Sequence, residues 1–234
     1  MLNFKYLVKD NLINLINSDI RRIKSKNLTY LPQGALYNIY KSIKLIEKNN
    51  IPGIFVETGC ALGGSTILIG LTKSNTRKLN VYDVFDMIPP PSDADGPDVQ
   101  ERYQDIKEGK SKGIKVDLYY GYEKNLLEKV KQNLNDFGLL NCNINLIKGL
   151  YEDTLLLNEP VAFAHIDCDW YSSVMLSLKQ IEPNLSNGGV MIIDDYYNWS
   201  GCKKAVDEYF YDKRKKDSYR FQVKNRKLII TKNN

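Results

Sequence analysis

Four aspartates follow two short apolar runs of the sequence, and together they could serve metal or proton chemistry. Asp167 and Asp169 follow the run VAFAHI, and Asp194 and Asp195 follow the run VMII. If these runs are neighbouring parallel strands about 4.8 Å apart, the carboxylates of Asp167, Asp194 and Asp195 meet within the span of one ion. Close carboxylates repel one another unless a hard divalent cation neutralises them. Magnesium fits this oxygen set better than zinc, because no thiolate or imidazole set accompanies it.

His165 is the only histidine, and strand alternation places it on the same face as Asp167. It either fills the core or lies near the metal and the acceptor substrate, and we favour the core. Asp169 shares this alternation but follows the strand end. It could therefore support the metal ligands without binding the ion itself.

Aromatic residues cluster beside these carboxylates. They are Trp170, Tyr171, Tyr196, Tyr197 and Trp199. Such side chains usually fill the core, but a flat aromatic surface also suits the apolar face of a sugar ring. We expect Tyr197 and Trp199 to line the acceptor.

A glycine-rich turn, ETGCALGGST, follows an earlier apolar run and begins at Glu57. Its glycines let the backbone approach a ligand closely. The dinucleotide fingerprint GxGxxG fails because residue 61 is alanine, and the P-loop pattern fails because Ser65 stands where the lysine belongs. A turn that serves only helix packing is the structural alternative.

The turn resembles the E/DxGxxxG motif of Rossmann-like methyltransferases, which packs against S-adenosylmethionine (SAM). Asp83 ends the next apolar run. An acidic residue at this place in nucleotide sites accepts hydrogen bonds from ribose hydroxyls. We therefore expect Asp83 to do so here.

The elements that must position these residues alternate along the chain. Apolar residues at helical spacing predict two N-terminal helices, over residues 4–23 and 36–46. Short β-rich runs separated by longer segments then predict a parallel sheet with helical crossovers. These runs cover residues 54–58, 79–84, 144–148, 161–167 and 190–194. Residues 220–224 and 227–231 predict an antiparallel hairpin, so the expected fold is α/β with a mostly parallel seven-stranded sheet.

The chain length of 234 residues suits a single domain. We expect an N-terminal helical lid segment over residues 1–50 and a core over residues 51–234. An insertion over about residues 86–143 contains PPPSDADGPD and a helical stretch. Segments this long between strands are usually functional, which favours a mobile lid over a plain surface insertion.

Composition excludes several classes of protein. The net charge is +5, but the lysines are scattered, which favours a solvated surface over a nucleic-acid site. The four cysteines form no CxxC pair and are expected to be free thiols. No apolar run reaches the roughly 20 residues of a membrane span, and the N-terminus lacks a secretion signal, so we expect a cytoplasmic location. A homo-oligomer is compatible with the sequence.

Five motifs occur in the order found in the macrocin and mycinamicin (TylF) family of sugar O-methyltransferases, which the chain resembles. They are VETGCALGGST, VYDVFDMIPPP, IKGLYEDTL, HIDCDWYSSV and GGVMIIDDY. The resemblance implies a Rossmann-like class I methyltransferase fold, with SAM and Mg²⁺ as cofactors. It implies Asp167, Asp194 and Asp195 as the magnesium ligands, with Asp167 also as the base. The SAM contacts that it implies are Glu57, Gly59, Asp83 and, near the adenine, Asp153.

The function that this resemblance implies is methyl transfer from SAM to a hydroxyl of a sugar or glycosylated small molecule. A catechol-type O-methyltransferase is the alternative that also uses magnesium. An NAD-dependent sugar oxidoreductase is disfavoured by the broken GxGxxG pattern. A nucleotide- or RNA-binding module has only the net charge in its favour.

Overall fold

The computed structural model describes residues 17–213 and 217–233. Its centre is a seven-stranded sheet with the order β3-β2-β1-β4-β5-β7-β6. The strands are β1 (Ile54–Thr58), β2 (Leu79–Asp83), β3 (Ile144–Lys148), β4 (Val161–Ile166), β5 (Leu185–Ile193), β6 (Tyr219–Lys224) and β7 (Lys227–Lys232). All neighbouring pairs from β3 to β5 are parallel, whereas β7 runs antiparallel to both β5 and β6. The predicted α/β fold and its closing hairpin are confirmed.

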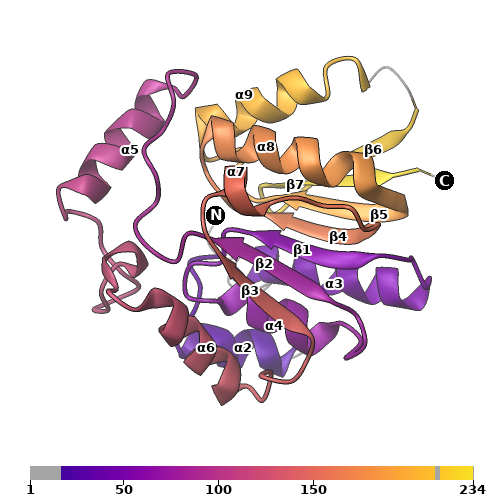
Figure 1. Ribbon diagram of the computed structural model, residues 1–234, viewed down its shortest axis with the longest axis horizontal. Helices are drawn as coiled ribbons and strands as arrows, with labels where there is room; N and C mark the ends of the chain where they lie inside the picture. Colours follow the sequence, from indigo (N-terminus) through magenta and orange to yellow (C-terminus); the bar gives the residue numbers. More distant parts are fainter. Residues whose placement is uncertain (1–16, 214–216, 234) are drawn as a thin grey trace, which may run out of the picture.

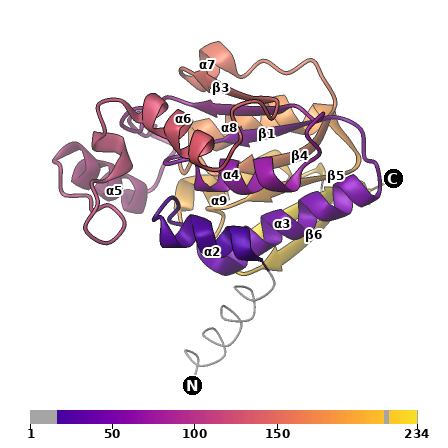
Figure 2. The ribbon, with the colours of Figure 1, turned by 90° about the horizontal axis from the view of Figure 1, so that it is seen from below.

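Helices cover both faces of the sheet (Figures 1 and 2). One face packs against α2 (Ser18–Ser25), α3 (Gln33–Lys48), α4 (Gly64–Thr72) and α6 (Leu126–Asp136). The other face packs against α8 (Tyr171–Ile181) and α9 (Ser200–Tyr209), with the short α7 (Tyr151–Thr154) nearby. All residues of β1, β2 and β4 are buried, as expected for central strands that are covered on both faces.

The N-terminal helices agree with the sequence pattern where the structure describes them. The predicted helix over residues 36–46 lies inside α3, and α2 covers the end of the predicted helix over residues 4–23. Residues 4–16 of that prediction lie outside the described residues. Both α2 and α3 contribute to the core that the sheet shares, and the division of the chain at residue 50 stays a prediction.

The long insertion between β2 and β3 contains α5 (Pro97–Lys107), a 3-10 turn over Tyr120–Tyr122, and α6. Helix α5 stands apart from the sheet in Figure 1. It has a small core of its own, in which Val99, Ile106 and Tyr119 pack against Trp170 from the loop after β4. The insertion therefore contacts the loop that carries the predicted metal ligand.

No helix in the described ranges is long and apolar enough to cross a membrane.

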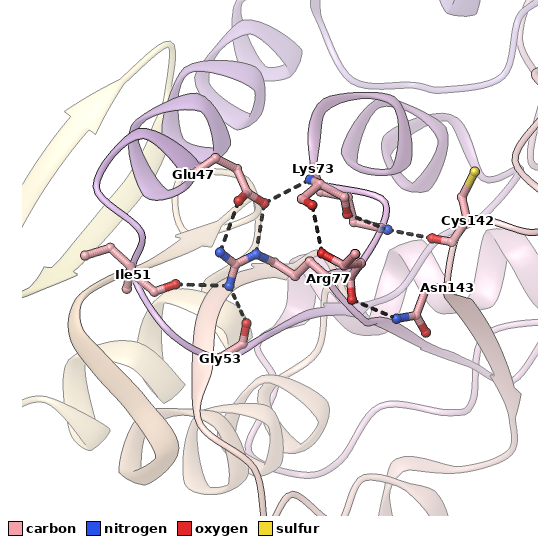
Figure 3. A network of polar contacts seen from close by, with 9 residues as sticks. Glu47, Ile51, Gly53, Lys73, Arg77, Cys142 and Asn143 are labelled. Atoms are coloured by element: carbon pink, nitrogen blue, oxygen red, sulfur yellow. Dashed lines mark hydrogen bonds and ion pairs between the residues drawn. The ribbon is translucent and has the colours of Figure 1, made fainter.

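A polar network at the opposite, N-terminal ends of the strands holds α3 to the loop before β2 (Figure 3). The Arg77 guanidinium donates to both carboxylate oxygens of Glu47, at 2.9 and 3.1 Å, and to the carbonyl oxygens of Ile51 and Gly53. It also lies 4.9 Å from the centre of the Phe55 ring. This planar group therefore joins three segments with one side chain.

We expect Arg77→Lys to lower the free energy of unfolding by about 1 to 3 kcal/mol, because an ammonium cannot reproduce the two-pronged contact and both carbonyl contacts. Chemical denaturation measures the change. Arg21→Lys, at an exposed position of α2, is the matched control and should lie within about 0.5 kcal/mol of wild type. Equal stability of the two variants would contradict the proposed role of the network.

Candidate active site

A cavity of about 650 Å³ lies at the carboxyl ends of the central strands. The glycine turn and Asp83 line one part of it, and Asp167, Asp194 and Asp195 line another. The insertion and the connection between α2 and α3 complete its wall, through residues such as Pro89 and Tyr30. This is the position at which open α/β sheets bind ligands.

The glycine turn is fixed by the ends of the two neighbouring strands. Gly59 has φ +85°, and a Cβ atom there would lie 2.0 Å from the carbonyl oxygen of Asp167. The Cys60 N–H donates to Asp83 Oδ2 at 2.8 Å. Only glycine allows this approach, so the turn and the aspartate after β4 are positioned by each other.

Asp83 is buried and lines the cavity. Besides Cys60, its carboxylate accepts a hydrogen bond from the Phe85 N–H at 2.7 Å. Burial raises the pKa of Asp83 above its usual value, although these backbone hydrogen bonds oppose the shift. Its orientation is therefore set before any ligand binds.

Glu57 lies behind the turn and does not line the cavity. It is fully buried; one carboxylate oxygen accepts a hydrogen bond from the Thr66 hydroxyl, and the other lies 2.9 Å from His165 Nδ1. Glu57 and His165 are direct neighbours in the register of β1 and β4. The structure therefore places both residues in the core beneath the site, and their contacts with SAM and the acceptor stay predictions.

The three aspartates predicted to bind metal come together. Each offers an oxygen atom, and these atoms lie within 4.8 Å of one another. The Asp167 N–H donates to the Thr58 carbonyl and the Asp194 N–H to the Ile166 carbonyl, both at 2.9 Å, so the hydrogen-bond ladder continues past the strand ends. This extension of the sheet fixes the backbone that carries the carboxylates.

The cluster has the electrostatic character of a cation site. Within the described residues, Asp194 Oδ1 and Asp195 Oδ2 are buried and have no hydrogen-bond partner. Burial, followed by the charges of Asp194 and Asp195, raises the pKa of Asp167 well above its usual value. Burial and Asp195 likewise raise the pKa of Asp194, to about 6, against the opposing effect of Lys227. Free, desolvated carboxylate oxygens are what a hard divalent cation would bind.

Lys227 is a buried cation beside this cluster that sequence reasoning missed. Its ammonium group donates to the carboxylate of Asp194 and, at 3.1 Å, to the carbonyl oxygen of the same residue. The antiparallel register pairs Ile193 with Leu228, which places Lys227 opposite Asp194 across the two strands. A lysine at the start of the apolar run KLIIT was the available signal, but its partner depends on that register.

Asp169 is a further carboxylate that lines the cavity. It is held by Trp199, one of the residues predicted to line the acceptor substrate. Its backbone is left-handed at φ +57°, and its Oδ1 accepts a hydrogen bond from Trp199 Nε1 at 2.8 Å. Burial and the neighbouring Asp195 carboxylate raise the pKa of Asp169 well above its usual value. Trp199 lines the cavity, as expected from the sequence.

Two other predicted residues lie elsewhere. The Tyr197 side chain is 43% exposed and is not part of the cavity wall. Asp153 is exposed and also lies off the cavity, whereas the adjacent Tyr151 and Glu152 line it. Because α7 is a single short turn of helix, a shift of one residue in phase decides which side chain faces the cavity.

Methyltransferases are among the solved structures that this fold resembles. The structure of the O-methyltransferase NovP matches with a TM-score of 0.72 at 25% identity, over 88% of this chain and 82% of that chain. A putative caffeoyl-CoA O-methyltransferase from Staphylococcus aureus matches with a TM-score of 0.62 at 18% identity, over 100% of both chains, and supports the fold alone. The class defined by the fold is therefore that of the Rossmann-like O-methyltransferases, as the sequence predicted.

The family is shown by the sequence comparison. The model of the macrocin O-methyltransferase (TylF) family matches residues 25–220, and the chain belongs to this family. Demethyldecarbamoylnovobiocin O-methyltransferase of Streptomyces niveus is 32% identical over 185 residues, which are 74% of this chain and 64% of that protein. Mycinamicin III 3''-O-methyltransferase of Micromonospora griseorubida is 30% identical over 188 residues, 77% of this chain and 69% of that protein. The aligned part is thus less than two thirds of the first relative.

Proposed function

We propose that the protein transfers a methyl group from SAM to a hydroxyl of a sugar or glycosylated small molecule, with assistance from Mg²⁺. One observation carries the proposal: a single cavity brings the glycine turn and Asp83 together with the carboxylates of Asp167, Asp194 and Asp195. Family membership favours methyl transfer over hydride transfer. By their names, the two relatives above methylate demethyldecarbamoylnovobiocin and mycinamicin III. A third relative, from Streptomyces olivaceus, methylates by its name a rhamnosyl tetracenomycin, which supports a glycosylated acceptor.

The glycine turn and Asp83 are the proposed SAM site. The backbone at Gly59 can approach the ligand, and Asp83 is oriented to accept hydrogen bonds from ribose hydroxyls. Tyr151 and Glu152, which line the cavity, take the place that the resemblance gave to Asp153. Glu57 lies behind this site and accepts a hydrogen bond from Thr66 in the first turn of α4, which would hold the start of that helix in place. Bound SAM supplies an electrophilic methyl group.

Asp167, Asp194 and Asp195 are the residues that would hold Mg²⁺. Their fit rests on the grouping of their oxygen atoms and on the unpartnered buried oxygens of Asp194 and Asp195. A bound Mg²⁺ would supply Lewis-acid stabilisation of negative charge on the acceptor oxygen. Lys227 would keep one oxygen of Asp194 occupied and leave Oδ1 available.

Asp167 is the proposed proton acceptor. A carboxylate of ordinary pKa is about 12 units less basic than the conjugate base of water, a gap of roughly 16 kcal/mol, so it cannot deprotonate an alcohol without electrostatic help. A Mg²⁺ ion held by the cluster would supply this help by stabilising negative charge on the acceptor oxygen. Asp169, oriented by Trp199, lies on the same cavity and would orient the acceptor hydroxyl.

The charge of the cavity favours an acceptor without a phosphate group. Its described lining has seven acidic side chains against two basic ones, Arg102 and Lys227. Lys227 is held by Asp194, and the Arg102 guanidinium donates to the Ser111 hydroxyl at 2.8 Å within the insertion. Even with Mg²⁺ held by three of these carboxylates, a diphosphate would find no free basic cluster in the described lining. A glycoside therefore suits the cavity better than a nucleotide sugar.

A methyl-transfer assay over glycosides, nucleotide sugars and catechols, with and without Mg²⁺, tests this function. We expect turnover with glycosides, loss of that turnover after EDTA treatment, and recovery on addition of Mg²⁺. SAM binding, measured by calorimetry, should largely survive chelation because the metal is assigned to the acceptor hydroxyl. Full activity at a verified absence of metal would exclude the metal-assisted mechanism, and turnover of catechols alone would favour the catechol-type enzyme.

We expect Asp83→Ala to weaken SAM binding roughly 10- to 150-fold, because loss of a charged hydrogen-bond partner costs about 1.5 to 3 kcal/mol. Isothermal titration calorimetry measures the affinity. Asp153→Ala is the matched control, and its exposed position off the cavity predicts an unchanged affinity. The opposite ranking of the two variants would return Asp153 to the site and remove Asp83 from it.

A further inference from the structure

A buried aspartate of the insertion, Asp95, joins the insertion to helix α8. Its Oδ1 accepts a hydrogen bond from the N–H of Tyr171, the first residue of α8, at 2.7 Å. Its Oδ2 accepts hydrogen bonds from the N–H and the hydroxyl of Ser92, both at 2.9 Å. One carboxylate thus receives three donors, and its negative charge lies at the positive end of the α8 dipole.

Helix α9 packs against the same carboxylate. A Cβ atom on Gly201, in the first turn of α9, would lie 1.9 Å from Asp95 Oδ1. The neighbouring Asp98 accepts a hydrogen bond from the Ser200 N–H at 2.9 Å, at the start of α9. The insertion therefore holds the N-termini of α8 and α9, which lie side by side on one face of the sheet (Figure 1).

These helix starts directly follow residues of the cavity. Trp170 precedes α8, and its Nε1–H donates to the Pro89 carbonyl of the insertion at 3.0 Å. Trp199 precedes α9 and donates to Asp169. The two indole rings meet edge to face, with centroids 5.8 Å apart. Tyr171, which Asp95 contacts, is thus two residues after Asp169 in the chain. It directly follows Trp170, whose ring packs against Trp199.

We propose that Asp95 is a positioning residue for the acceptor: it holds residues 88–98 against the starts of α8 and α9, and so fixes Asp169 and Trp199 on the acceptor side of the cavity. The acceptor part of this proposal rests on the proposed function. Asp95 itself does not line the cavity, so it acts through the residues that it holds.

Asp95→Asn is the first test. An amide nitrogen must face either Tyr171 N–H or the Ser92 donors, so at least one hydrogen bond is replaced by a donor–donor contact. Asp93→Asn is the matched control, since Asp93 is exposed on the same segment. Circular dichroism and thermal unfolding establish that both variants fold.

Tryptophan fluorescence reports on the contact between Asp95 and the start of α8, and it needs no substrate. The chain has two tryptophans, and both lie at this junction. In Asp95→Asn we expect a red-shifted emission and a larger acrylamide quenching constant, because Trp170 is only 2% exposed while the contact holds. Asp93→Asn should match wild type. An unchanged spectrum and quenching constant in Asp95→Asn would overturn the proposal even if the protein proved to have another activity.

Kinetics separate positioning from a merely structural role. For a glycoside that wild type turns over, Asp95→Asn should raise the acceptor KM roughly 10-fold, the effect of losing about 1.4 kcal/mol, while the SAM dissociation constant stays within about twofold. Equal weakening of SAM and acceptor would indicate general distortion and overturn the proposal.

Gly201→Ala provides a second variant that leaves Asp95 unchanged. Alanine normally favours a helix over glycine, so propensity alone predicts a more stable protein. The proposal predicts instead the fluorescence change and the KM change of Asp95→Asn, because the added methyl group displaces the same carboxylate. The double variant should show little more than either single change, since both disrupt one contact. Wild-type behaviour of Gly201→Ala would contradict the proposed packing.

Discussion

Replacing Asp167 by asparagine is expected to lower the rate of methyl transfer by about 10²- to 10⁴-fold, and added Mg²⁺ should not restore it. Asparagine keeps a carbonyl oxygen for a metal but cannot take the proton from the hydroxyl group of the substrate. Asp167 is the cluster member that retains partial exposure to the cavity, whereas Asp194 and Asp195 are buried. This difference suits it for contact with the substrate.

Asp195→Asn is the matched comparison, because Asp195 is assigned the role of ligand alone. We expect its activity to recover partly as Mg²⁺ is raised, by mass action on a weakened site. Steady-state rates over a series of Mg²⁺ concentrations measure both variants. Thermal unfolding with and without SAM shows whether each still folds and binds the cofactor.

If saturating Mg²⁺ rescued both variants equally, Asp167 would be only a ligand. The base would then have to be sought among the other carboxylates of the cavity. Asp169 becomes the first candidate, since it lines the cavity and Trp199 orients it. His165 suits that role less well than the sequence allowed, because it is fully buried and its Nδ1 faces Glu57.

Gly59→Ala is expected to cost about 3 kcal/mol or more of unfolding free energy and to remove SAM binding. Two effects combine: a left-handed backbone is unfavourable for alanine, and the new Cβ would lie 2.0 Å from the Asp167 carbonyl oxygen. The end of β4 or the glycine turn must then move, and either movement displaces the site. Chemical denaturation and calorimetry with SAM measure the two losses.

Gly109→Ala and Gly138→Ala separate these two effects. Both glycines have φ +73°, but a Cβ atom at either would meet nothing within 4 Å. We expect each to cost only about 1 to 2 kcal/mol, the backbone contribution alone, with SAM binding intact. A Gly59→Ala protein no less stable than these controls would mean that the close approach to Asp167 is not required.

The sequence by itself determined which segments form strands, and that most of these strands are parallel while the last two form an antiparallel hairpin. The runs that form β1, β2 and β4 are rich in apolar residues because both faces of these strands are covered, and that pattern is local. The hairpin was also predicted from the sequence, because only two residues separate its β-rich runs. In the structure these two residues, Asn225 and Arg226, adopt positive φ, at 51° and 61°, as a tight turn requires. Asp167 and Asp194 follow β4 and β5, which pair in parallel, so their convergence followed once the strands were recognised.

The tertiary structure decided which polar residues face one another. Glu57 was predicted as a SAM contact from its place before the turn, and the register of β1 and β4 sets its side chain beside His165 in the core. Lys227 reaches Asp194 only because β7 runs antiparallel to β5. Asp95 meets the starts of α8 and α9 from a segment more than seventy residues earlier. Strand alternation and helix periodicity describe one element at a time, whereas these contacts depend on how distant elements are aligned.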